Sequence, residues 1–271
     1  MTEREHPQVS TLIYDWNTAG TGYPHRAHPV EFDDETLRDG LQSPSVRDPD
    51  IATKIRLVHL MEELGIHTVD VGLPGAGPRA VADITALCQE ITGARMRITA
   101  NCAVRTVKSD ITALIEISQK VGMPIEACAF IGSSPIRQYA EEWTIDHVLK
   151  LTEDAVSYAV ANGLPVMFVT EDTCRATPDT ITRLYKTAIN AGAKRVCVCD
   201  TVGHITPRGV RNLIPFVRQV IRETGEDIKI DWHGHNDRGL GVINTITAMT
   251  SGVDRLHGTA LGIGERVGNC S

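Results

Sequence analysis

Two short stretches of the sequence carry side chains suited to chemistry. One of them has the pattern His-x-His, at His233 and His235. Side chains on a β-strand alternate between its two faces, so both imidazoles would lie on one face. Two neutral imidazoles and one carboxylate form a common divalent-metal site that keeps positions open for a substrate. The two stretches are Asp34-Glu-Thr-Leu-Arg38-Asp39-Gly40-Leu-Gln42 and His233-Gly-His235-Asn236-Asp237.

The elements that would position these residues alternate between strands and helices. After the first, short β-branched runs begin about every 30 residues, which is the length of one βα unit. Amphipathic stretches fill the gaps, and Thr144 is an N-cap candidate for one of them. The alternation favours a parallel sheet covered by helices, and eight strands favour a closed (β/α)8 TIM barrel. The expected strands are 29–34, 67–72, 95–101, 125–131, 165–170, 195–200, 229–233 and 255–260, and the clearest helices are 51–64, 144–162, 178–191 and 207–223.

In such a barrel the active site lies at the carboxyl ends of the strands. The first and seventh strands are both odd-numbered, so their inward side chains can share a layer. Asp39 is therefore the expected third ligand beside His233 and His235. The residue types suit zinc, manganese, magnesium or iron and do not name the ion. The alternative is that the two histidines are hydrogen-bonded residues at a strand end.

The expected domain organisation is an N-terminal extension over 1–28 followed by one barrel domain over 29–271. The sequence ends at Ser271, soon after the eighth strand, so we expect seven barrel helices and no last helix within this chain. The open face would then be closed from outside, by a second copy in a homodimer or other homo-oligomer, or by a partner chain supplying a cover domain.

Composition excludes several classes of protein. The 271 residues include 27 basic and 34 acidic side chains, and a net charge of −7 argues against nucleic acid or an anionic membrane as the main partner. The N-terminus lacks the apolar stretch of a signal peptide, and no apolar run is long enough for a membrane helix. Seven cysteines read better as reduced thiols of a cytoplasmic protein than as a disulfide framework. Cys197 and Cys199 could suggest a metal site, but their apolar run favours buried small hydrophobes.

Three ordered motifs make the sequence resemble a known family. They are the two stretches above and Gly258-Thr-Ala-Leu-Gly-Ile-Gly-Glu-Arg-Val-Gly-Asn269. Together they resemble the isopropylmalate synthase and homocitrate synthase family, metal-dependent TIM-barrel acyltransferases related to hydroxymethylglutaryl-CoA lyase. The resemblance implies an enzyme of amino-acid biosynthesis that condenses acetyl-CoA with a 2-oxo acid to give a 2-substituted malate.

The resemblance also implies roles for single residues. Asp39, His233 and His235 match the metal ligands, and Arg38 matches an arginine that stabilises charge on the enolate or alkoxide oxygen. Gln42 matches a position at the mouth of the pocket that binds substrate or metal-bound water.

Other expected strand ends match the family too. Glu171 is similar to a glutamate that takes part in catalysis through substrate or proton handling, and Thr201 to a threonine that contacts the substrate carboxylate. Glu265 and Asn269 fall in a loop beside the acyl-CoA and the metal, where they would support the ligands. The glycines of that loop do not have the spacing of a dinucleotide fingerprint.

Arg137 bears on the choice of substrate. Isopropylmalate synthases usually have histidine at this position, whereas homocitrate synthases often have arginine. A guanidinium facing the pocket would favour a 2-oxo acid with a second carboxylate, such as 2-oxoglutarate or oxaloacetate. An exposed surface arginine is the alternative.

Two other functions stay open from the sequence. One is a retro-aldol lyase acting on a hydroxyacyl-CoA, although the glycine loop near strand eight lacks the cysteine of such lyases. The other is the barrel subunit of a split synthase, inactive alone. The general base is not identified, and His204 is a conceivable candidate without support from the family pattern.

Overall fold

The computed structural model describes residues 29–271 as a closed barrel, so the expected extension over 1–28 lies outside the described residues. Each strand pairs in parallel with the next, and the first pairs with the last. This confirms the predicted (β/α)8 barrel. The strands are β1 (Glu31–Asp34), β2 (Thr68–Asp70), β3 (Thr99–Arg105), β4 (Glu126–Gly132), β5 (Val166–Glu171), β6 (Arg195–Asp200), β7 (Lys229–Gly234) and β8 (Arg255–Gly258).

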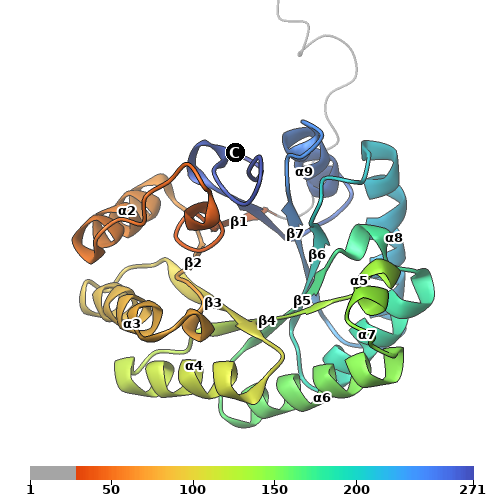
Figure 1. Cartoon of the computed structure of the whole chain (residues 1–271), viewed down its shortest axis with the longest axis horizontal. Helices are drawn as coiled ribbons and strands as arrows, with labels where there is room; N and C mark the ends of the chain where they lie inside the picture. The colour runs from red at the N-terminus through yellow and green to blue at the C-terminus, as the bar shows by residue number, and fades with distance from the viewer. Residues whose placement is uncertain (1–28) are drawn as a thin grey trace, which may run out of the picture.

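The helices form a ring outside the strands (Figure 1). Seven of them follow β1 to β7 in turn, and the short α5, which was not predicted, is inserted before α6. Within residues 29–271, only a 3-10 turn, Ala260–Gly262, follows β8. The helices are α2 (Ile51–Leu64), α3 (Pro78–Gly93), α4 (Lys108–Val121), α5 (Pro135–Ala140), α6 (Ile145–Ala161), α7 (Pro178–Asn190), α8 (Pro207–Arg222) and α9 (Gly241–Thr250).

Side-chain caps fix where several helices begin. The hydroxyl of Thr144 accepts a hydrogen bond of 3.2 Å from the backbone N–H of His147, which confirms it as an N-cap. Thr177 and Thr206 cap α7 and α8 in the same way, and each is followed by a proline at the first helical position. Thr177 and Thr206 thereby end the short loops that follow β5 and β6.

The third strand is the largest error of the sequence-based prediction. It was expected at 95–101 but runs from Thr99 to Arg105. Arg95 has a φ of 54° and belongs to the turn that ends α3. The true strand contains two alanines and an asparagine, which have little β propensity, so its signal was weak.

The apolar core has two parts. A large layer lies between the strands and the helices, and a small cluster fills the barrel interior. On β6, valines face the helices while Cys197 and Cys199 face inward, so both thiols are buried as predicted. The inner cluster is Cys128, Met167, Cys197 and Cys199.

A buried ionic layer lies deeper in the barrel. Asp231 is fully buried on β7, and its two carboxylate oxygens accept hydrogen bonds from Arg195 at 2.8 Å and Arg255 at 2.5 Å. Arg255 also donates to Glu126 at 2.5 Å. Each buried charge is therefore paired, as burial requires.

No helix in the described part of the chain combines the length and apolarity needed to cross a bilayer.

Candidate metal centre and active site

A cavity of about 490 Å³ opens at the carboxyl ends of the barrel strands. Its floor includes the thiols of the inner cluster, and its wall carries most of the sequence-predicted site residues. Asn269 does not line it but contacts Asp39, which does. The predicted site residues that line the cavity are Arg38, Asp39, Gln42, Arg137, Glu171, Thr201, His233, His235 and Glu265.

Two strands, β1 and β7, and the segment after β8 position the candidate metal ligands. The chain turns after β1, and Asp39 directly precedes the 3-10 turn Gly40–Gln42. His233 lies on β7, and His235 follows it on the same face. An isolated antiparallel bridge joins His235 to Asn269, which brings the final segment of the chain over the ring of strand ends.

The polar atoms of Asp39, His233 and His235 converge on one point. The two Nε2 atoms are 3.1 Å apart, and Asp39 Oδ2 lies 3.6 Å from His233 Nε2 and 3.7 Å from His235 Nε2. Ligand atoms about 2.1 Å from a divalent ion are separated from one another by about 3.0–3.4 Å in octahedral or tetrahedral geometry. The observed separations are close to these values, so the three side chains can hold an ion with small adjustments.

The protonation states also suit a metal. Burial lowers the pKa of His233 and of His235 to about 3, so both imidazoles are neutral and can offer a lone pair. Burial alone would raise the pKa of Asp39, but the Arg38 guanidinium and the two histidines outweigh it and hold that pKa well below its usual range. One carboxylate and two neutral imidazoles are therefore available at neutral pH.

Asn269 and the glycine loop add a further polar group. Asn269 Nδ2 donates to Asp39 Oδ1 at 2.8 Å, while its own Oδ1 is buried and has no hydrogen-bond partner. The backbone N–H of Glu265 lies 3.3 Å from the same Asp39 oxygen. At Gly264 a Cβ would overlap Asn269 Nδ2 and lie 2.8 Å from Asp39 Oδ1, so only glycine fits there. The unpartnered amide oxygen fits the presence of a cation beside Asp39.

Arg38 is held by three carboxylates. Its Nε donates to Asp70 at 3.0 Å and its NH1 to Asp39 at 3.1 Å, and its NH2 pairs with Glu35. Burial would lower the pKa of Arg38, but Asp70 and Asp39 outweigh it and raise that pKa further. The guanidinium is therefore a fixed positive charge at the cavity wall, next to the candidate metal ligands.

Three cavity residues escaped the sequence analysis. Glu35 and His257 contact each other at 2.7 Å, and Asp70 contacts Arg38. Burial raises the pKa of Asp70 to about 6. A usable signal existed for each, because Glu35 lies inside the first quoted motif and the other two lie on expected strands.

The remaining predicted substrate residues surround the cavity mouth. Arg137 lies 3.7 Å from Glu171 and 3.3 Å from Glu141, and its side chain is 41% exposed. Burial raises the pKa of Glu171. The Thr201 hydroxyl accepts a hydrogen bond of 2.8 Å from the backbone N–H of Asp172, and Gln42 is exposed at the rim.

His204 is not part of this cavity. It lines a separate hollow of about 630 Å³ between α7 and α8, together with Phe216 and Arg238. None of the candidate metal ligands lines that hollow. His204 therefore lines a different hollow from Arg38 and the candidate metal ligands.

The family model and the curated relatives that match this chain point to the same family. The model of the family described as HMGL-like matches residues 29–271. The 2-isopropylmalate synthase of Streptococcus gallolyticus is 35% identical over 243 residues, covering 89% of this chain and 45% of that protein. The homocitrate synthase of Methanothermobacter thermautotrophicus is 33% identical, covering 88% of this chain and 57% of that protein. The family resemblance found in the sequence is thereby confirmed, and the chain spans about half the length of the curated relatives it matches.

Solved structures agree on the fold. The HMG-CoA lyase of Brucella melitensis superposes with a TM-score of 0.69 at 19% identity, covering 88% of this chain and 83% of that one. The hydroxymethylglutaryl-CoA lyase of Pseudomonas aeruginosa gives a TM-score of 0.68 at 21% identity, covering 86% and 77%. At this identity the likeness supports the barrel and not a shared reaction.

Proposed function

Because the chain belongs to the HMGL-like family, we propose that its barrel catalyses the metal-assisted condensation of acetyl-CoA with a 2-oxo acid. Carbon–carbon bond formation would give a thioester, and its hydrolysis by water would release a 2-substituted malate and free coenzyme A. The relatives named 2-isopropylmalate synthase and homocitrate synthase support this reaction over the lyase reaction. The catalytic unit we propose is the barrel domain over 29–271.

One observation carries the proposal within the structure. Arg38 NH1 lies 3.1 Å from the same Asp39 oxygen, Oδ2, that faces both histidines. A fixed guanidinium and a set of metal ligands therefore meet at one wall of a cavity large enough for a small oxo acid. This pairing suits a reaction that develops negative charge on an oxygen.

The candidate ligands define how the metal would be held. Asp39, His233 and His235 would bind a divalent ion, with the amide oxygen of Asn269 as a neighbouring donor. The bound ion would supply a Lewis acid that polarises the keto group of the oxo acid. Zinc, manganese and magnesium are the ions we propose.

The chain's own side chains would do the rest. Arg38 would stabilise the keto oxygen as it gains negative charge during formation of the carbon–carbon bond. Glu171, whose pKa is raised by burial, would handle a proton at the acetyl methyl group. Thr201 would bind the oxo acid's carboxylate and Gln42 would contact substrate at the rim of the cavity.

Arg137 would select the oxo acid. Arg137 lines the cavity beside Glu171, and Cys128 and Met167 of the inner cluster line it too. A second carboxylate on the substrate would find a cationic partner there, whereas a branched alkyl group would not. We therefore place 2-oxoglutarate and oxaloacetate ahead of 2-oxoisovalerate.

The test is release of the coenzyme A thiol from acetyl-CoA in the presence of pyruvate, 2-oxoisovalerate, 2-oxoglutarate or oxaloacetate. Release that depends on an oxo acid and on a divalent ion is expected. Cleavage of hydroxymethylglutaryl-CoA without such release would contradict the synthase proposal and favour the lyase.

We propose that a second copy of the chain, or a partner chain, closes the mouth of the barrel. Binding of a 2-oxo acid measured by calorimetry, together with no thiol release, would support a barrel that needs such a partner. Light scattering that shows a monomer with full activity would contradict it.

A further inference from the structure

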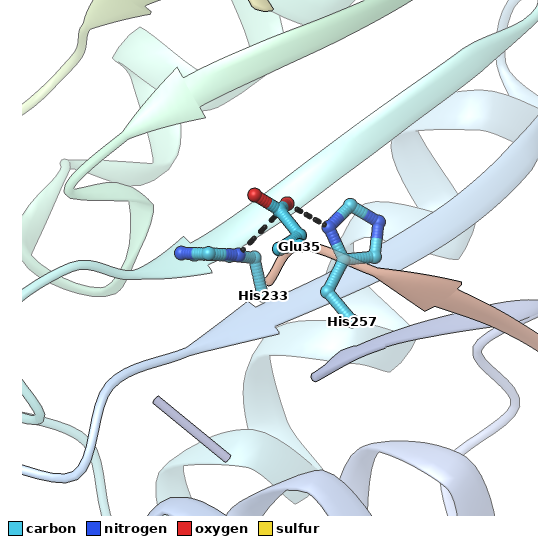
Figure 2. Close-up of side chains that lie close together, drawn as sticks. All are labelled: Glu35, His233 and His257. Carbon is cyan, nitrogen blue, oxygen red and sulfur yellow. Dashed lines mark hydrogen bonds and ion pairs between the residues drawn. The ribbon is translucent and has the colours of Figure 1, made fainter. Parts of the chain in front are cut away.

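A buried contact network lies behind the metal-facing side of His233. Figure 2 shows the carboxylate of Glu35 between the rings of His233 and His257. Glu35 Oε1 lies 3.2 Å from His233 Nδ1 and 2.7 Å from His257 Nδ1. The three residues come from the end of β1, from β7 and from β8, and all are buried.

This contact determines which nitrogen of His233 is free. The nearest atom to His233 Nδ1 in this network is a carboxylate oxygen, and an ionised carboxylate can only accept a hydrogen bond. The proton of the neutral ring is therefore best placed on Nδ1, which leaves a lone pair on Nε2. Nε2 is the atom that faces Asp39 and His235, at 3.6 and 3.1 Å.

Glu35 is itself fixed from two sides. Its Oε2 pairs with Arg38, and the ring of His257 holds Oε1. The other nitrogen of His257 lies 3.0 Å from Asp231, the fully buried carboxylate of the ionic layer. The His257 ring also meets the His233 ring edge-to-face, with centroids 5.7 Å apart. The position of Glu35 is thus tied to the rigid interior of the barrel.

The same three residues could instead be taken as a second set of metal ligands, since their donor atoms lie close together. The partners argue against this. Both nitrogens of His257 already face carboxylates, and both oxygens of Glu35 are engaged. Neutral His233 has one lone pair, and it cannot serve both sets at once.

We propose that Glu35, held by His257, is a positioning residue that orients His233 for metal binding. The proposal rests on the proposed function, because it assumes that Asp39, His233 and His235 bind a divalent ion. Metal-ligating histidines commonly donate their second N–H to a carboxylate, which fixes the ring and its tautomer. In this chain the carboxylate would be Glu35. His257, which contacts Asp231 of the buried ionic layer, would hold that carboxylate in place.

The test is titration of chelator-treated full chain with Co²⁺, followed by the visible absorption of the bound ion. Glu35→Ala is expected to weaken Co²⁺ binding by about ten- to a hundredfold, the usual loss for such a partner, and to change the absorption bands. Glu35→Gln retains an acceptor oxygen and should recover part of the affinity. His257→Gln should show a smaller loss in the same direction.

Asp110→Asn is the matched control. Asp110 is a buried residue of α4 that does not line the cavity. Its carboxylate pairs with Arg105 at 2.8 Å. Its loss should lower the thermal stability of the apo chain without moving the Co²⁺ affinity or the spectrum. If Glu35→Ala does not fold, Glu35→Gln and His257→Gln carry the same comparison.

The outcomes distinguish failure of the positioning role of Glu35 from failure of the proposed function. One Co²⁺ per wild-type chain, lost in Asp39→Asn but bound by Glu35→Ala with unchanged affinity and spectrum, would overturn the positioning role alone. Two Co²⁺ per wild-type chain, one of them lost in His257→Gln, would overturn it in favour of a second metal site. No binding by the wild type would overturn the proposed function together with it.

Discussion

The amide of Asn269 donates a 2.8 Å hydrogen bond to Asp39 Oδ1, across 230 positions of the chain. The contact joins the turn after β1 to the segment that follows β8. The Asn269 backbone also bridges to His235. One residue therefore contacts two of the three candidate metal ligands.

Gly264→Ala should damage this arrangement more than a change of one methyl group suggests. The new Cβ would overlap Asn269 Nδ2 and crowd Asp39 Oδ1, so one of them must move. We expect metal affinity to fall at least about tenfold, as for the loss of a supporting contact. Gly93→Ala, at the end of α3 with open space around its Cβ, is the control and should leave the affinity unchanged.

Removal of a candidate ligand should remove the ion. Metal analysis of the purified wild type should find about one divalent ion per chain, and His235→Ala or His233→Ala should have lost it. His204→Ala, in the separate hollow, should retain it. Equal metal in all four proteins would show that these histidines are not ligands.

Arg38→Lys should separate catalysis from metal binding. Lysine keeps the positive charge but loses the planar fork that contacts Glu35, Asp39 and Asp70. We expect kcat for thiol release to fall by about a hundredfold or more with metal content close to wild type. A fall in metal content that matches the fall in kcat would assign Arg38 to the metal site instead.

Arg137→Ala should change the order of substrates. If the guanidinium binds a second carboxylate, KM should rise by about tenfold or more for 2-oxoglutarate and oxaloacetate and change little for 2-oxoisovalerate. Arg56→Ala, at an exposed position of α2, provides the control. Equal effects on all three oxo acids would speak against a role in selectivity.

His257 should make the metal-free protein less stable in alkali. Burial alone would lower its pKa, but the interactions with Cys197 and with the carboxylates of Asp33 and Asp231 outweigh burial and raise the pKa from 6.5 to about 9. The folded chain therefore holds this proton more tightly than the unfolded chain. The contribution is complete below pH 6.5 and is lost as pH rises through 9, amounting to about 3 kcal/mol at most.

Chemical unfolding in the presence of chelator, between pH 6 and 10, measures this dependence. The fall in unfolding free energy over that range should be markedly smaller in His257→Gln than in the wild type. Parallel curves for the two proteins would assign the alkaline loss to other groups.

The sequence predicted the fold well because its signals are local. Apolar runs, Thr144 and the prolines at helix starts each act within a few residues, and the structure places their elements within a residue or two. The prediction of β3 was wrong because Thr99–Arg105 is poor in β-branched residues. This strand is stabilised by its pairing with β2 and β4. The short α5 was not predicted because six residues are too few to show the apolar periodicity of a helix.

The candidate site could be predicted only where several of its residues fall within one short motif. His233 and His235 stand out because they share one strand face, and Asp39 follows from the order of strands in a closed ring. The Glu35–His257 contact spans 222 positions, and neither residue type is unusual at a strand end. Each residue could be noticed singly, but their contact becomes visible only when the register of β1 against β8 is known.

The inward face of β7 carries Asp231 and His233, and His235 continues the same alternation directly after the strand ends. The first belongs to the buried ionic layer, and the other two face Asp39. A slip of β7 by one position against β6 would turn all three toward the helices at once. The register of β7 therefore sets the orientation of Asp231 and of both histidines together. Capture of an ion during refolding would therefore report that the seventh strand has found its native alignment.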